Sequence, residues 1–142
     1  MTIHQLSVFL ENKSGTLVKV LQVLKQENIQ LIASTIADTA DYGICRIICS
    51  DPVKAYNVLK EAGVAVSLCD VLAVELDDEP GRAADAISLF AGEGVSIAYL
   101  YSFLLNGKGV LVFRTDNPDK AEEIIKENGL KPIAESELSS LV

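Results

Sequence analysis

Two polar loops divide this sequence: "ENKSGTL" at residues 11–17 and "DDEPGRA" at residues 77–83. Each loop follows a strand-like segment, precedes a helix-like segment and carries a glycine at the same offset, Gly15 or Gly81. The gapless shift that places Gly15 on Gly81 also aligns other apolar and turn-forming positions, called matched positions below: Val8 with Val74, Leu10 with Leu76, Gly43 with Gly109, Pro52 with Pro118 and Gly63 with Gly129. Because glycine and proline mark turns, both halves should turn at the same places, which indicates an internal duplication.

The apolar pattern within one copy predicts its elements. Helical spacing marks residues 15–28 and 52–62, and β-branched or alternating runs predict strands at 3–11, 29–37, 43–50 and 64–68. The second copy repeats the order at 71–76, 82–93, 95–103, 109–115, 118–127 and 130–135. We therefore expect an α+β fold of two tandem ferredoxin-like βαββαβ units, residues 1–68 and 69–142. Each unit has two helices on one face of an antiparallel sheet, and the units are expected to be joined side by side.

The seam between the copies, "GVAVSLCDVLAVEL" at residues 63–76, contains no glycine or proline cluster and no run of charges. Such a short apolar connection is unlike a flexible linker, so we expect the two sheets to be held in a fixed relation. Strand segments such as "GVLVF" at residues 109–113 are apolar on both faces. One face can pack on the helices and the other needs a partner surface, which favours a homodimer.

Charge and composition exclude several classes of partner. The formal net charge is −8, with 49% hydrophobic and 23% charged residues, which is typical of a globular protein. No basic cluster is present to attract a nucleic-acid backbone or an anionic membrane. The first residues have no positive start followed by a long apolar stretch, and no run approaches the length of a membrane span. We expect a cytoplasmic protein.

The residues that usually perform catalysis or bind metals are sparse. His4 is the only histidine, and it stands beside no nucleophile. Cys45 and Cys49 lie on one predicted strand, where positions four apart are separated by roughly 13 Å, too far for two ligands of one metal. With Cys69, they are interpreted as small packing residues. Motifs for a serine hydrolase, a zinc protease, a P-loop or a dinucleotide site are missing, so we predict no enzyme activity, cofactor or metal.

The first loop has the chemistry of a carboxylate site. A glycine at a strand-to-helix turn lets the backbone approach a ligand closely, and the first-turn amides carry the positive end of the helix dipole. The amide of Asn12 both donates and accepts hydrogen bonds, so it could bind an α-amino group or a side chain. The alternative is a plain capped turn, because Asn, Ser and Gly are common turn residues.

These residues resemble those of a tandem pair of ACT domains, the small regulatory modules of amino-acid metabolism. The resemblance covers nearly the whole chain and is carried by the two loops, by "LVKVLQVLKQENIQL" at residues 17–31, and by "AADAISLFAGEGVSIAYLY" at residues 83–101. Members of that family commonly pair side by side. They bind an amino acid between units, using the first strand-to-helix loop of one unit and the second strand of its neighbour.

The resemblance implies a set of ligand-binding positions. In the first copy they are Asn12, Lys13, Ser14, Gly15, Thr16 and Leu17, with Gln30 and Leu31 on the second strand. In the second copy they are Pro80, Gly81 and Arg82, after the acidic Asp78 and Glu79, with Ser96 and Ile97 on the second strand. Ser14 departs from the family pattern, which has proline there. The acids of the second loop would repel a carboxylate unless Arg82 or an amino group offsets them, so the first copy is the better carboxylate site.

Three functions compete. The first is a non-catalytic, amino-acid-binding regulatory protein that signals to a separate enzyme or regulator of amino-acid metabolism. The second is a protein–protein interaction module of the same fold that binds no metabolite. A small enzyme is the third, and the missing nucleophile and acid–base residues argue against it. The sequence does not identify which amino acid would bind.

Overall fold

Turn residues and apolar periodicity produce two compact units in the computed structural model, which describes all residues except 1, 12–14, 39–41 and 141–142. The first unit contains His4–Cys69 and the chain from Ser136 onward. The second unit contains Asp70–Glu135 and the first residues up to Ile3. The expected domain division between residues 68 and 69 stays a prediction. Among the described residues, no helix is long and apolar enough to cross a membrane.

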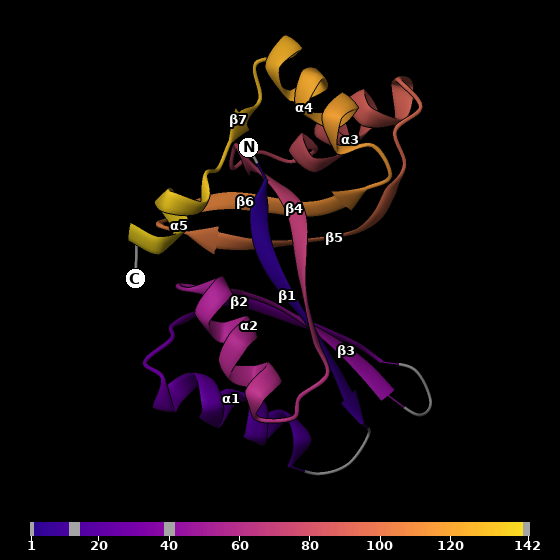
Figure 1. Ribbon diagram of the computed structural model, residues 1–142. Coiled ribbons are helices and arrows are strands. Elements are labelled where there is room, and N and C mark those ends of the chain that lie inside the picture. The colour runs from indigo at the N-terminus through magenta and orange to yellow at the C-terminus, as the bar shows by residue number, and fades with distance from the viewer. Residues whose placement is uncertain (1, 12–14, 39–41, 141–142) are drawn as a thin grey trace. The chain divides into compact units, whose positions relative to one another are not determined.

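The first unit is built from one ferredoxin-like set of elements. In chain order these are β1 (Ile3–Glu11), α1 (Thr16–Gln26), β2 (Leu31–Asp38), β3 (Tyr42–Cys49), α2 (Pro52–Glu61) and the beginning of β4 (Val66–Leu76). The strands lie in the order β2-β3-β1-β4, and both helices cover one face of the sheet (Figure 1). The predicted α+β fold of βαββαβ units is confirmed.

The second unit repeats this arrangement. The remainder of β4 is followed by α3 (Arg82–Gly92), β5 (Ile97–Leu105), β6 (Lys108–Thr115), α4 (Pro118–Glu127) and β7 (Lys131–Pro132). The strand pair Leu6 and Ile47 in the first unit corresponds, at matched positions, to the pair Leu72 and Phe113 in the second. The register of strand pairing shifts at the start of β2, between Leu31 and Ala33, and again at the start of β5, between Ile97 and Tyr99. The duplication therefore extends to the pairing register.

The structure differs from the sequence-based expectation at the seam and at the C-terminal end. The strands predicted at residues 64–68 and 71–76 form one continuous strand, β4. The predicted final strand at residues 130–135 is reduced to β7, a two-residue strand paired with β4. Pro132 has no N–H group to donate to a ladder, which accounts for the short pairing. A short helix, α5 (Glu135–Ser140), follows instead. Within the first unit, the Ser139 hydroxyl donates to the Ser50 carbonyl oxygen at 3.3 Å.

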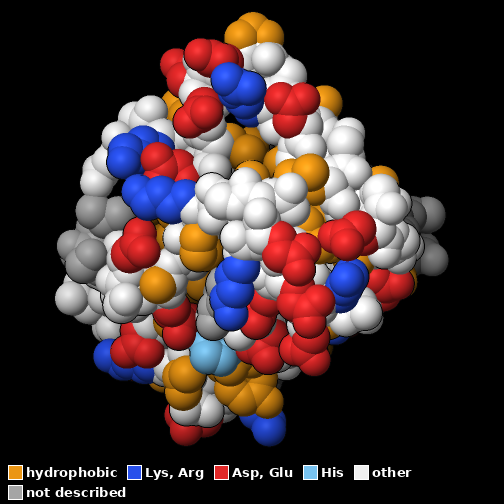
Figure 2. Space-filling model, turned by 90° about the horizontal axis from the view of Figure 1, so that it is seen from above, with side chains coloured by type: hydrophobic (Ala, Val, Ile, Leu, Met, Phe, Trp, Pro, Cys, Tyr) orange, Lys and Arg blue, Asp and Glu red, His pale blue; other side chains and the backbone are white. Residues whose placement is uncertain are grey.

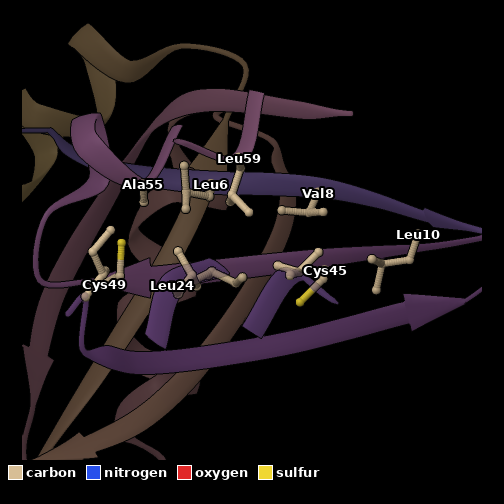
Figure 3. Packing of buried hydrophobic residues seen from close by; sticks show 11 residues of the cluster. Leu6, Val8, Leu10, Leu24, Cys45, Cys49, Ala55 and Leu59 are labelled. Atoms are coloured by element: carbon tan, nitrogen blue, oxygen red, sulfur yellow. The ribbon is translucent and has the colours of Figure 1, made fainter. Parts of the chain in front are cut away.

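Each unit has its own hydrophobic core between sheet and helices. In the first unit, alternate residues of β1 and β3 point toward the apolar stripes of α1 and α2, as Figure 3 shows. Its labelled members are Leu6, Val8, Leu10, Leu24, Cys45, Cys49, Ala55 and Leu59. The prediction that Cys45 and Cys49 are packing residues is confirmed, since both thiols are buried and in no disulfide, whereas Cys69 is partly exposed. Burial also raises the pKa of the Cys45 thiol.

Candidate functional site

The first strand-to-helix loop is shaped by a left-handed glycine. Gly15 has φ 89° and ψ −11°, and it occupies the N-cap position of α1, where no described side chain makes a capping hydrogen bond. An L-residue with a side chain adopts this backbone region at a cost, so glycine suits the position. The Thr16 hydroxyl donates to the Glu11 carbonyl oxygen at 3.0 Å and so connects the two ends of the loop. The predicted site residues Asn12, Lys13 and Ser14 lie outside the described residues.

The second loop has the same backbone and different charges. Gly81, with φ 88°, begins α3 as Gly15 begins α1. Arg82 follows and forms ion pairs with Asp77 at 3.6 Å, with Asp85 at 3.5 Å and with Glu79. Arg82 is therefore paired with acids of this loop and of α3. Pro80, the remaining predicted residue of this loop, is exposed.

The predicted second-strand residues lie away from the loops within each unit. The backbone N–H of Gln30 donates to the Ser50 hydroxyl at 2.9 Å, and that of Ser96 donates to the Asp116 carboxylate at 3.1 Å. Leu31 and Ile97, the next residues, begin β2 and β5. Gly15 and Gln30 stand at opposite ends of the 11-residue helix α1, which spans about 16 Å. A ligand that touches both kinds of position therefore needs the second strand of another unit.

Beside each loop the structure places a groove that sequence reasoning missed. The first groove encloses about 510 Å³ and lies between the end of β1, the start of α1 and the segment after α2. It is lined by Phe9, Leu10, Glu11, Thr16, Lys19, Val20, Tyr42, Gly63, Val64 and Ala65. Leu10 and Val20 are buried, whereas the Phe9 and Tyr42 rings are about half exposed, with centroids 6.3 Å apart. The groove is thus apolar at its base and has aromatic rings along its side.

The second groove lies at the equivalent position in the second unit. It encloses about 380 Å³ and is lined by Glu75, Leu76, Asp77, Arg82, Asp85, Ala86, Leu89, Gly129, Leu130 and Lys131. All of these except Leu89 match a residue that lines the first groove. The aligned copies contain no sequence signal for the grooves themselves, but the charge differences at matched positions indicate how their linings differ.

Ion pairs line the second groove. The Lys131 ammonium lies 2.9 Å from the Glu75 carboxylate, and Lys108 lies 3.4 Å from it. The hydrogen bond from Lys131, supported by Lys108, lowers the pKa of Glu75. Together with the Arg82 pairs, these contacts satisfy the charges of the groove from within the chain. In the first groove, by contrast, no ion pair among the described residues involves Lys19.

The surface charge is mostly negative. Figure 2 shows more acidic than basic side chains on the surface in view, in keeping with the net charge of −8. A further hollow of about 540 Å³ beside the second loop is lined by Asp77, Asp78 and Glu79, among others. An anionic ligand would be repelled there. The first groove, with Lys19, is the more favourable place for a carboxylate.

Comparisons with known proteins agree with this architecture. A family model described as an ACT domain pair matches residues 1–142. A protein of Bacteroides thetaiotaomicron with a crystal structure is 45% identical, with a TM-score of 0.93 over 99% of this chain and 98% of that one. The regulatory subunit of aspartate kinase from Thermus thermophilus is 14% identical, with a TM-score of 0.61 over 87% of this chain and 91% of that one, which indicates a shared fold. The search of curated proteins found no match.

Proposed function

The chain belongs to the ACT domain pair family, whose model matches residues 1–142, and on that premise we propose that it is a non-catalytic regulatory protein that binds a free amino acid. The ACT domain pair is a regulatory module, and here it accounts for the whole sequence. Gly15 is the observation that carries the proposal. It begins α1 in a left-handed conformation without a described side-chain cap, which suits acceptance of a ligand carboxylate by the first-turn amides.

The proposed site combines this loop with a second unit. The α-carboxylate would lie at the amides of residues 14–17, where the helix dipole favours negative charge. Asn12 would bind the amino group or the side chain of the ligand. Because Gln30 stands at the far end of α1, the second-strand contacts would come from Gln30 or Ser96 of a neighbouring unit. The first loop is favoured over the second, where Arg82 already pairs with three acids.

We also propose that the protein acts as a cytoplasmic homodimer and passes its signal to a separate enzyme or regulator of amino-acid metabolism. An exposed sheet edge supports the dimer: β2 ends the strand order of the first unit, and Ile36 on it is 48% exposed. Val18 on α1 is 54% exposed. Edge strands and apolar side chains of this kind usually need a partner. Sedimentation should give twice the 15.3 kDa chain mass, and a monomer at micromolar concentration would contradict the dimer.

Calorimetry with the common amino acids tests the ligand. Charge-assisted hydrogen bonds are worth about 1.5–3 kcal/mol, so Asn12→Ala should weaken binding by roughly tenfold or more. The matched control is Asp78→Ala at the equivalent position of the second copy, which should bind like the wild type.

The proposal fails if no amino acid binds below millimolar concentration, or if the two variants weaken binding equally. The first loop is then only a capped turn. In that case the exposed edge of β2 favours the interaction module of the same fold as the function.

A further inference from the structure

The two grooves provide an internal comparison. Their linings occupy matched positions in the two copies of the fold. The side chains differ most in charge and size at four of these positions. Where the second groove has Glu75, Arg82, Asp85 and Lys131, the first groove has Phe9, Thr16, Lys19 and Ala65. Any difference in what the grooves bind must arise from these side chains and their neighbours.

The second groove is lined by charged side chains that pair with one another. Arg82 lies 3.6 Å from Asp77 and 3.5 Å from Asp85, and Lys131 lies 2.9 Å from Glu75. With three acids against two cations, the lining is net negative. A carboxylate entering there would meet like charge.

The first groove offers open space instead. Thr16 and Ala65 are shorter than the Arg82 and Lys131 that replace them in the second groove, and the enclosed volume is larger, about 510 Å³ against about 380 Å³. Its base is formed by Leu10 and Val20, which are 8% and 1% exposed. An apolar group placed on this base would lose contact with water on the side that faces Leu10 and Val20, and burial of apolar surface is the usual source of affinity in small-molecule sites.

Lys19 supplies the positive charge of the first groove, whose lining is neutral because Glu11 supplies one negative charge, whereas the lining of the second groove is net negative. It stands where the second groove has Asp85, and no ion pair among the described residues satisfies its ammonium group. A carboxylate is the complementary ligand group. The aromatic rings of Phe9 and Tyr42, 6.3 Å apart, border the same space and can pack against a hydrocarbon or an aromatic body.

We propose that the first groove binds a small carboxylate with an apolar body, such as an amino acid with a hydrocarbon side chain, and that the second groove binds none because its lining carries a net negative charge. This inference narrows the ligand class of the proposed function. It rests on the proposed function only in assuming that the ligand also carries an amino group. Each chain then binds one ligand, and Lys19 determines specificity for the carboxylate.

Titration calorimetry with five probes tests the class. L-leucine, L-phenylalanine and 3-phenylpropionate carry a carboxylate and an apolar body, L-serine lacks the apolar body, and 2-phenylethylamine lacks the carboxylate. We expect at least one of the first three probes to bind, with one site per chain. The last two should bind at least about tenfold more weakly, which corresponds to about 1.4 kcal/mol.

Variants then place the ligand in the first groove. Lys19→Gln should weaken binding about three- to fivefold at low salt, the range of an exposed ion pair. Lys25→Gln, the same change on the same helix but outside the groove, should leave affinity unchanged. Thr16→Arg with Lys19→Asp installs the charges of the second groove and should weaken binding about tenfold or more. Lys19→Gln alone decides the question if the double variant folds poorly.

The outcomes separate this inference from the proposed function. If L-serine binds and is lost in Asn12→Ala while the apolar probes do not bind, the proposed function stands and the groove inference is wrong. If 3-phenylpropionate binds in a Lys19-dependent way and no amino acid does, the groove inference stands and the proposed function is wrong. Binding of apolar probes that is unchanged in both Lys19 variants overturns the inference, as does the absence of binding by every probe.

Discussion

Replacing Gly15 by alanine should destabilise the protein through backbone conformation alone. A Cβ added at Gly15 would meet nothing within 4 Å, so no steric clash contributes. The cost arises from φ 89°, because an L-residue in the left-handed region loses about 1–2 kcal/mol. Alanine also reduces the entropy of the unfolded chain, which returns about 0.4–1 kcal/mol. The net expected loss in the free energy of unfolding is about 1 kcal/mol.

Two further glycines serve as controls for this prediction. Gly81 has φ 88° and equal space, so Gly81→Ala should cost the same within about 0.5 kcal/mol. Gly92 lies in α3 with a negative φ and also has open space around it. Because alanine is the better helix former, Gly92→Ala should instead stabilise by about 0.5–1 kcal/mol.

Urea unfolding followed by circular dichroism measures all three variants against the wild type. The difference of sign between Gly15→Ala and Gly92→Ala is the sharpest expectation, since both changes add the same methyl group without a clash. If Gly15→Ala were as stable as the wild type, the left-handed conformation would not constrain this loop. The loop would then not require glycine to form the candidate site.

Two other predictions concern the core and the ion pairs. Cys45→Ala should cost about 1 kcal/mol in the free energy of unfolding, because the removed sulfur is buried. Cys69→Ala, at a partly exposed site, should cost less than about 0.5 kcal/mol; a larger loss at Cys69 than at Cys45 in urea titrations would contradict packing as the role of these thiols. The carboxyl of Glu75 has a lowered pKa in the folded state, so its ion pairs stabilise the protein above the ordinary glutamate pKa of about 4.3. This contribution should disappear as the pH falls through the lower folded-state pKa, and Glu75→Gln should then unfold at the same urea concentration as the wild type. A stability difference that persists below that folded-state pKa would show that the side chain acts by packing.

The sequence by itself determined the repeat and most of its elements. Glycine permits a left-handed turn and proline fixes φ at the first helical position. These local preferences set the backbone at Gly15 and Gly81, and at Pro52 and Pro118. The alternation of apolar residues then selected strands and helices. For this reason both copies could be predicted as βαββαβ units, with Cys45 and Cys49 among the packing residues. The loop glycines could be placed at helix starts from sequence spacing alone.

Only the tertiary structure decided how segments far apart in the chain meet. It assigned the chain from Ser136 onward to the first unit, reduced the last predicted strand to two residues, and placed Lys131 beside Glu75 in the lining of the second groove. It also made Lys19 and Tyr42 neighbours in one lining. Backbone propensity acts over a few residues, so a sequence pattern can predict it. Grooves and ion pairs depend on which distant side chains the packed sheet and helices bring together, and that is fixed only when the whole core forms.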